Sequence, residues 1–318
     1  MRHMMNKLKL ACIIAFLLSV GIGWGAASGL ASDAAQSGTV PVSMVVSIEA
    51  KHGGEIPTIN REDVRVTQGK TRLRVTDWVP LQGDQAGLQL FVLLDDADRT
   101  NVSLQFGDLR QFMGAQAAST SIGVAYMQYG AAEIVQNPTT DRALAEKALR
   151  LPLSFAGVSG SPYESISDLI KRWPESTARR EIFLVSSGID RLYGSGPDDP
   201  YLTEAIDQAQ RAQIQIYAIY ASEAGHFGHS YWSLNWGQND LSRLAEETGG
   251  EFYIQGTQTP IEFKPFLDQF ADRLTHQYRV TFLATPEKKA GYQRVTLGTE
   301  VPNAELVSSD RVYVPAAK

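Results

Sequence analysis

Alternating hydrophobic and polar residues mark both ends of the chain. Near the front, segments 42–48, 64–67 and 73–76 alternate with period two, which predicts half-buried strands. The turn residues 68–70 between the last two predict a hairpin. At the other end, the same alternation predicts strands at 278–284, 293–297 and Arg311–Val314. We therefore expect a small β unit at each end of the chain, and we expect the two to pack together.

Continuous apolar runs alternate with helical patterns in the middle of the chain. Residues 88–94 form a continuous apolar run, as in a strand that is buried on both faces. Further strands are predicted at 121–127, 132–135, 181–185, 213–220 and 251–254. Helices are predicted at 104–118, 141–149, 163–173, 201–212, 239–248 and 260–276, with Thr203 as a candidate N-cap. This alternation predicts an α/β fold with a doubly wound, mostly parallel sheet and helices on both faces.

The first 31 residues have the layout of a signal peptide. Basic residues (Arg2, Lys7 and Lys9) precede an uncharged apolar run at 11–24, and small residues follow it. Gly29 and Ala31 fit a small-x-small cleavage pattern, so we expect a cut near Ala31 and an exported protein, periplasmic or secreted. The alternative is an uncleaved anchor, because 11–31 is long enough to span a bilayer.

These patterns divide the chain into five parts. They are a signal peptide (1–31), a linker (32–39), an N-terminal β unit (40–82), an α/β domain (86–276) and a C-terminal β segment (277–318) that packs with the N-terminal unit.

Charge narrows the classes of partner. The 318 residues carry a net charge of -6. Removing the signal peptide leaves 26 basic and 35 acidic residues, a net charge of -9. Such an acidic chain is not expected to bind nucleic acid, and membrane contact is expected only through an uncleaved N-terminus. The one cysteine, Cys12, lies in the predicted signal peptide, so we expect no disulfide.

The first candidate ligand loop is acidic. Ligands of open α/β sheets bind beyond the carboxyl ends of the strands, which points to the loops at 95–103, 186–201, 221–238 and 255–259, joined by 156–163. Asp95, Asp96 and Asp98 put three carboxylates in four residues, and Mg²⁺ or Ca²⁺ prefers such oxygen ligands. The alternative is a solvated loop that caps the next helix.

One enzymatic hypothesis rests on the same loop. Asp96, Asp98 and Thr100 match the Asp-x-Asp-x-Thr pattern of haloacid-dehalogenase-type phosphatases, and 182–186 resembles their later strand. The paired acids that should follow a further strand are missing after 214–220. A Mg²⁺-dependent phosphatase that uses Asp96 and Asp98 is therefore an alternative function.

A second candidate loop combines histidines with aromatic residues. His226 and His229 lie three residues apart, and Trp232 and Trp236 follow. A zinc site needs a third ligand, for which Asp240 is the candidate. The other interpretations are a partner contact, since Trp anchors many interfaces, or a lid whose aromatic side chains complete the core.

The order of several segments resembles that of the von Willebrand factor A (VWA)-related proteins of the Acidobacterial type. The segments that carry the resemblance are 59–70, 90–96, 139–144, 182–190, 278–282 and 309–315. The resemblance implies a VWA-like fold over most of the mature chain. It also implies a face that binds partners through a metal-ion-dependent adhesion site, built from Asp-x-Ser-x-Ser, a distant Thr and a distant Asp.

This adhesion site is degenerate here. Asp95 matches its first Asp, but Ala97 and Arg99 replace the two serines. We expect Arg99 to pair with a neighbouring carboxylate in place of the metal. The distant Thr falls near Gly160 or Ser161, and the distant Asp falls on Ser187, with Asp190 displaced by three residues. We therefore expect no cofactor and no tightly bound metal. The weak candidate ligands are Asp95, Asp96, Asp98, His226, His229 and Asp240.

The function predicted from the sequence is that of an exported, non-enzymatic binding module. Its carboxyl-end loops would face a protein or cell-envelope partner. The candidate binding residues are Asp95, Asp96, Asp98, Arg99, Ser161, Ser187, Asp190, His226 and Trp232. The alternatives are the phosphatase and a metal-regulated adhesin.

Overall fold

The computed structural model describes residues 38–154, 160–174, 176–194, 196–222 and 231–316. All of them belong to Gly38–Lys318, the second of two compact units into which the chain divides. The predicted signal peptide lies outside the described residues. Within them, no helix is both long and apolar enough to cross a membrane.

A six-stranded sheet forms the centre of the α/β domain. Its strands are β5 (Leu88–Asp95), β6 (Thr120–Gln128), β7 (Ala131–Thr139), β8 (Arg179–Ser186), β9 (Ile214–Tyr220) and β10 (Phe252–Tyr253). They lie in the order β10-β9-β8-β5-β6-β7. All neighbours are parallel except β6 and β7, which form an antiparallel pair. The predicted mostly parallel, doubly wound sheet is confirmed, and its order reverses between β5 and β8.

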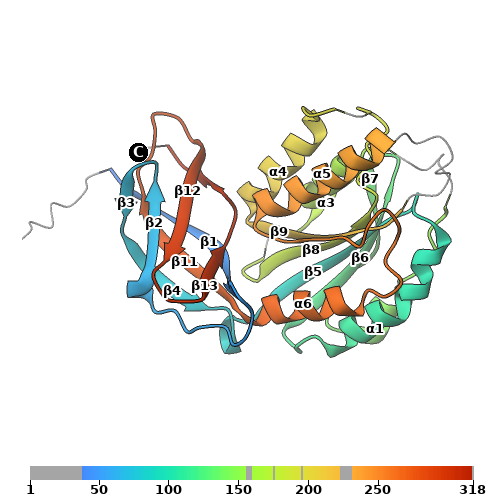
Figure 1. Ribbon diagram of the computed structural model, residues 1–318, viewed down its shortest axis with the longest axis horizontal. Helices are drawn as coiled ribbons and strands as arrows, with labels where there is room; N and C mark the ends of the chain where they lie inside the picture. The colour runs from blue at the N-terminus through green and yellow to red at the C-terminus, as the bar shows by residue number, and fades with distance from the viewer. Residues whose placement is uncertain (1–37, 155–159, 175, 195, 223–230, 317–318) are drawn as a thin grey trace, which may run out of the picture. The chain divides into compact units, whose positions relative to one another are not determined.

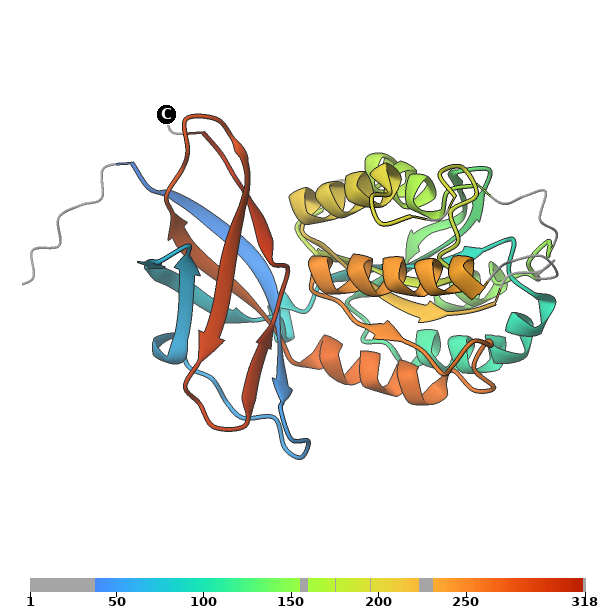
Figure 2. The ribbon, with the colours of Figure 1, turned by 45° about the horizontal axis from the view of Figure 1, so that its top comes forward.

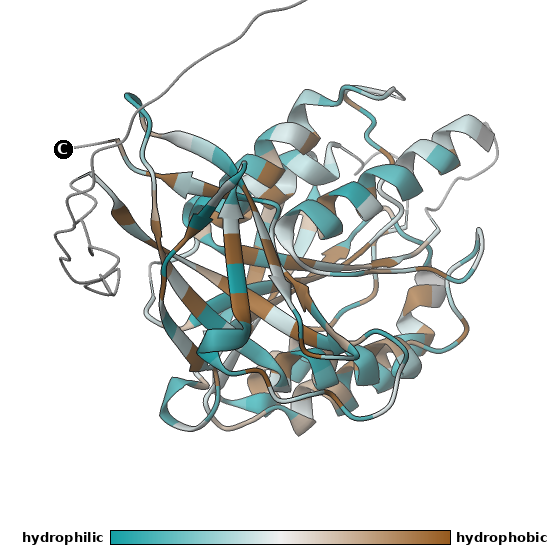
Figure 3. Ribbon diagram, turned by 60° about the vertical axis from the view of Figure 1, so that its left-hand side comes forward, coloured by the Kyte–Doolittle hydropathy of each residue, from teal (hydrophilic) through white to brown (hydrophobic). Residues whose placement is uncertain are grey.

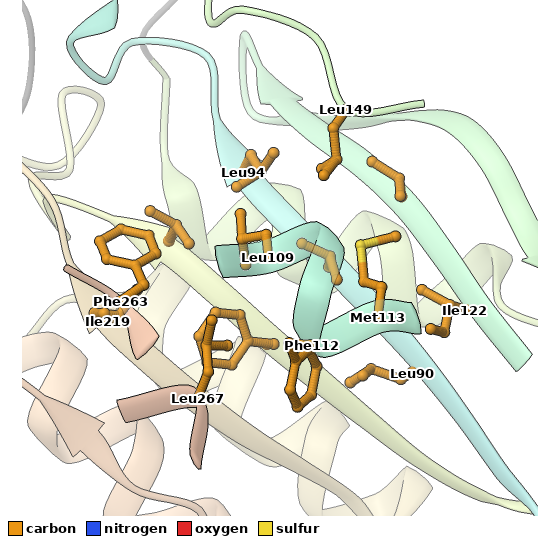
Figure 4. Close-up of a cluster of buried hydrophobic side chains, with 14 of the residues drawn as sticks. Leu90, Leu94, Leu109, Phe112, Met113, Ile122, Leu149, Ile219, Phe263 and Leu267 are labelled. Atoms are coloured by element: carbon orange, nitrogen blue, oxygen red, sulfur yellow. The ribbon is translucent and has the colours of Figure 1, made fainter. Parts of the chain in front are cut away.

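Helices cover both faces of this sheet. They are α1 (Phe106–Ala115), α2 (Arg142–Lys147), α3 (Pro162–Arg172), α4 (Pro200–Ala212), α5 (Tyr231–Thr248) and α6 (Lys264–Thr275), with the 3₁₀ turn η3 (Thr100–Gln105) before α1. Helices α3, α4 and α5 lie on one face, and α1 and α6 on the other (Figures 1 and 2). Leu90 and Leu94 of β5 face α1, as Figure 4 shows, whereas Phe91 and Leu93 face α3. Burial on both faces explains the continuous apolar run in β5.

Two helix starts differ from prediction. Helix α5 begins at Tyr231, so Trp232 and Trp236 lie on a helix and not in a loop. Gly237 is required inside this helix because a Cβ there would lie 2.5 Å from the carbonyl oxygen of Ser187. The N-cap of α4 is Asp199 and not Thr203, since its carboxylate accepts the first free N–H groups of the helix.

The β module, defined as the strands outside the α/β domain, consists of two four-stranded sheets. Its strands are β1 (Val40–Ala50), β2 (Val64–Gln68), β3 (Thr71–Leu73), β4 (Val75–Pro80), β11 (Gln277–Ala284), β12 (Gly291–Thr299), β13 (Ala304–Val307) and β14 (Arg311–Val314), with the 3₁₀ turns η1 (Arg61–Asp63) and η2 (Gly83–Gln85). The sheet orders are β13-β1-β11-β4 and β14-β12-β2-β3. Polar and apolar residues alternate along these strands (Figure 3). The apolar faces of both sheets, with Val46, Val66 and Phe282, share one core.

Strands from the two ends of the chain pair directly. β1 is antiparallel to β11 from Val40 opposite Ala284 to Ser47 opposite Gln277, and β2 pairs with β12. The predicted hairpin is confirmed between β2 and β3, with Gly69 at a φ of 59°. The single strand predicted at 73–76 is wrong, because the chain crosses there from one sheet to the other. At the crossing, the Arg74 carbonyl accepts a hydrogen bond from the Leu283 N–H.

Candidate functional site

The point where the strand order reverses is where an open α/β sheet positions a ligand site. Asp95 ends β5 and Ser186 ends the adjacent β8. The Ser186 hydroxyl donates to Asp95 Oδ2 at 2.9 Å, and the Ala97 N–H donates to Asp95 Oδ1 at 3.0 Å. Asp95 and Ser161 line one cleft of about 10 Å³, which is close to the space that one water needs. The predicted residues Asp95 and Ser161 are thus brought together around one small space.

Ser161 and Asp190 bind each other beside this cleft. Ser161 is the N-cap of α3, and its hydroxyl donates to Asp190 Oδ2. The other oxygen of Asp190 accepts the N–H groups of Leu192 at 2.6 Å and Tyr193 at 2.8 Å. Both side chains are buried. They fix the loop after β8 to the start of α3, so their first role is to hold the shape of this edge.

Asp96 is paired with Arg150, which is not among the candidate binding residues predicted from the sequence. Arg150, from the segment after α2, donates to both oxygens of the fully buried Asp96 carboxylate at 2.6 Å. Gln128 and the Leu153 N–H also donate to it. The Arg150 guanidinium lies 3.7 Å from the centre of the Tyr126 ring and pairs with Glu133 at 3.0 Å. The hydrogen bonds to Asp96 are the main cause that raises the pKa of Arg150.

This pairing changes two expectations. For Asp96, one of the three carboxylates that we considered as partners of Arg99, the cationic partner is Arg150. A phosphatase nucleophile must reach a substrate, but Asp96 has no exposed surface and its oxygens already accept hydrogen bonds from three residues. The geometry therefore gives no support to the phosphatase hypothesis.

Asp98 and Arg99 connect the first loop to its neighbours across the sheet edge. The buried Asp98 accepts a hydrogen bond at its carbonyl from the Ser154 hydroxyl at 2.6 Å. The Arg99 N–H donates to the Ser222 carbonyl, beyond the end of β9, at 3.3 Å. The backbone of the loop after β5 is thus held from two sides, by Ser154 from the segment after α2 and by Ser222 from the segment after β9.

Three buried carboxylates gather behind this edge. Asp190, Asp199 and Asp240 come from the β8 loop, the cap of α4 and the middle of α5. Burial, then the nearby Asp199, raises the pKa of Asp240 to about 7, with Arg243 opposing. Burial is also the main cause that raises the pKa of Asp199. In the described part of the chain, no group of three or more His, Cys, Asp or Glu side chains is arranged to hold a metal ion.

The remaining candidates lie apart. Ser187 is buried, and its hydroxyl accepts the Ile189 N–H at 3.3 Å. Trp232 lies in the first turn of α5 with 69% of its surface exposed. His226 and His229 fall outside the described residues. The predicted residues are therefore divided among a small cleft, a buried ion pair, an acidic cluster and an exposed surface.

Exposed apolar side chains surround the same edge. Among the described residues, every large exposed hydrophobic side chain except Val135 and Leu144 lies in a segment at the carboxyl ends of the strands. We call this set the apolar ring. Its members are Leu104, Tyr129, Leu151, Leu153, Leu192, Tyr193, Trp232, Ile254 and Ile261. Two of the segments that carry it are in contact, because the side chain of Gln105, which follows Leu104, donates to the Ile261 carbonyl at 2.7 Å.

Several residues that shape this edge had no clear signal in the sequence. Arg150 and Gln128 are 54 and 32 positions from Asp96, and nothing in their local pattern points to it. Ser186 ends the segment 182–186 that we compared with a phosphatase strand, but it was not among the candidate binding residues. Asp199 is different, because an Asp followed by Pro200 is a recognisable helix start that we did not use.

Comparisons with known proteins leave the family open. No family model matches the chain, and no curated protein matches it. Three solved structures illustrate the structural matches. BatB of Bacteroides thetaiotaomicron, a conserved hypothetical protein, is 10% identical with a TM-score of 0.45 over 59% of this chain and 98% of its own. The ArnB paralog VWA2 of Sulfolobus acidocaldarius is 11% identical with a TM-score of 0.41, over 87% of this chain and 76% of its own. The vWF domain of the type V pili tip protein Mfa5 of Porphyromonas gingivalis is 12% identical with a TM-score of 0.43, over 62% and 95%.

Structures named for VWA or vWF domains thus occur among the matches, at low identity and low TM-score. The assignment to the α/β class rests on the strand order and on the paired registers of the six-stranded sheet. Membership of the Acidobacterial type stays a prediction.

Proposed function

We propose that this protein is an exported binding module that presents the carboxyl-end loops of a VWA-like α/β domain to a protein or cell-envelope partner. The observation that carries the proposal is the apolar ring. Its members all lie at one edge of the sheet, and exposed apolar surface that gathers in one region marks contact sites, while aromatic side chains such as Trp232 anchor interfaces. The pattern of residues 1–31 supports export.

The charges at this edge favour contact through apolar side chains. Asp96 is neutralised by Arg150, and Asp190 accepts hydrogen bonds from Ser161 and two backbone N–H groups. Carboxylates that are engaged in this way offer little to an incoming metal or cation. We therefore propose recognition that does not require a divalent metal ion.

The test compares two sets of serine variants in a crosslinking experiment. The first set, Leu104→Ser, Trp232→Ser and Ile261→Ser combined, removes three members of the apolar ring. The matched control, Val135→Ser with Leu144→Ser, changes exposed apolar residues away from it. After incubation with the envelope fraction of the source organism, mass spectrometry quantifies crosslinked proteins.

The ring variant should lose most of the protein that the wild type captures, while the control and an EDTA-treated wild type retain it. Equal capture by both sets would show that the carboxyl-end loops are not the binding face. Loss of capture with EDTA alone would favour the metal-regulated adhesin instead.

A further inference from the structure

A cavity of about 550 Å³ lies at the end of the α/β domain opposite to the carboxyl edge. It lies between the helices α1 and α6, and the first residues of β5, β6 and β8 line it. A further wall comes from the segment 81–86, through which the chain enters the domain after β4. Small-molecule sites in proteins commonly have volumes of about 300–1,000 Å³. The cavity is therefore large enough for a small organic ligand.

The inner wall of this cavity is apolar. Its side chains come from β5, α1 and α6, and each of them is buried. They are Leu88, Phe112, Leu267 and Leu274. Phe112 stacks on Phe270 of α6 with 5.4 Å between the ring centres, so the two helices close this wall together. An apolar chain that enters the cavity is thus removed from water, which favours its binding.

The charges that line the cavity balance one another. Four charged side chains line it, two of each sign. Lys264 pairs with Asp268 at 2.8 Å. Asp108 accepts the N–H groups of Phe263 and Lys264, each at 3.0 Å, and so caps the start of α6. A charged ligand would therefore lose its hydration without gaining an unengaged partner of opposite charge.

Arg179, the fourth charged residue, is a buried polar group at the cavity wall, with 5% of its side chain exposed. Its guanidinium donates to the carbonyls of Leu81 at 3.1 Å and Leu274 at 3.0 Å. The Glu181 carboxylate lies 3.4 Å from Arg179 Nε and balances its charge. Burial raises the pKa of Glu181 to about 6, with Arg179 opposing, so this balance holds above that pH. A guanidinium has five N–H donors, so Arg179 keeps donors for an oxygen acceptor.

We propose that this cavity binds a small neutral amphiphile, whose apolar chain lies against α1 and α6 and whose carbonyl oxygen accepts a hydrogen bond from Arg179. The apolar inner wall selects the chain, the balanced charges select a neutral ligand, and Arg179 fixes the end that carries oxygen. The proposal does not depend on the proposed function, because the apolar ring lies at the other edge of the sheet.

Titration calorimetry of the mature chain at about pH 8, where Glu181 is charged, tests the choice of ligand. Octanamide is neutral, octanoate is anionic and octylammonium is cationic, and all three have the same chain length. Octanamide should bind at least fivefold more tightly than either charged ligand, because it alone brings no unbalanced charge. With ¹³C-labelled octanamide, the carbonyl resonance should move downfield on binding, since the carbonyl accepts a hydrogen bond from a cation.

A variant that fills the cavity assigns the binding to it. Ala271 of α6 lines the cavity and is half-buried, so Ala271→Phe places a ring in the space of the ligand. This variant should weaken octanamide binding by at least tenfold. The matched control, Ala143→Phe, adds the same ring to an exposed position of α2 and should leave the affinity unchanged. Circular dichroism checks that both variants stay folded.

Four results would overturn the proposal. Octanoate or octylammonium bound as tightly as octanamide would mean that charge balance does not select the ligand. Equal affinities of the wild type and Ala271→Phe would place the ligand elsewhere. An unchanged carbonyl resonance in the bound ligand would mean that Arg179 is not its partner. No binding at millimolar octanamide, by calorimetry or by NMR, would mean that the cavity is not a site for such ligands.

Discussion

Arg150 links four features of the carboxyl edge: the buried Asp96, the Tyr126 ring, Glu133 and the backbone. Its N–H donates to the Tyr126 hydroxyl at 2.6 Å, and that hydroxyl donates back to its carbonyl at 2.8 Å. A cation held this firmly does not adjust to a ligand. At the residue scale, the carboxyl edge is therefore a preorganised surface, and its charges mainly hold its shape.

Removing Arg150 should destabilise the fold strongly. Arg150→Ala leaves the Asp96 carboxylate buried without its cation, and breaking a buried pair in this way costs about 3–5 kcal/mol. Urea unfolding followed by circular dichroism measures the loss. The control is Lys264→Ala, which breaks an exposed pair with Asp268 and should cost less than about 1 kcal/mol. Similar losses in both variants would mean that the Arg150 pair is not structural.

Asp240 should make stability depend on pH. Its pKa is about 7 in the folded chain and near 3.8 when unfolded, so the folded state holds the proton more tightly. The tighter proton therefore contributes to the free energy of unfolding. This contribution is complete below about pH 3.8 and is lost as the pH rises through 7.

The side chain of the variant Asp240→Asn cannot ionise. Its free energy of unfolding, relative to that of the wild type, should therefore rise by about 1–3 kcal/mol from pH 5 to pH 8. Urea unfolding at both pH values gives this difference. The exposed Asp268→Asn variant is the control and should show no such change. A difference between wild type and Asp240→Asn that does not vary with pH would contradict the raised pKa.

At the scale of elements, close backbone contacts decide where helices and loops fit. Gly237 allows α5 to pass the carbonyl of Ser187, and Gly160 allows the start of α3 to pass the Gly130 N–H. These contacts join segments that are far apart in the sequence. They explain why a glycine that reads as a loop signal lies within the helix α5.

Gly250, between α5 and β10, should not tolerate a side chain. A Cβ there would lie 2.0 Å from the Ile216 carbonyl oxygen on β9, so the backbone must move to accept it. Gly250→Ala should therefore lower the free energy of unfolding by about 2–4 kcal/mol. Gly298→Ala is the matched control, because open space surrounds that position, and it should stay within about 0.5 kcal/mol of the wild type. Thermal and urea unfolding compare the two, and equal stability would show that β9 and β10 shift without strain.

At the scale of the whole described unit, the chain closes the β module with strands from both ends. β13 pairs with β1 and β14 with β12, so the last strands complete both sheets. Arg311 of β14 also pairs with Asp207 and Glu247 of the α/β domain at 3.1 and 3.3 Å. The C-terminal segment is therefore expected to contribute to stability well beyond its length.

Ending the chain after Ser308 should test this contribution. The truncation removes β14 with the buried Val312 and Val314, whose burial is worth about 3–6 kcal/mol together. The truncated chain should unfold at a lower urea concentration. Arg294→Gln, at a side chain that is 78% exposed, is the control and should change little. An unchanged midpoint for the truncated chain would mean that β14 adds nothing to the core.

The sequence by itself determined the class of fold. A strand that is buried on both faces has a continuous apolar run, and a strand that is buried on one face alternates between apolar and polar residues. The sequence also predicted which edge of the sheet carries the candidate site, since the carboxyl ends of parallel strands follow from the β–α order. It missed β13. The tertiary structure alone decided which charges are engaged. The partner of Asp96 lies 54 residues away, and the members of the apolar ring come from separate loops that the fold brings to one edge.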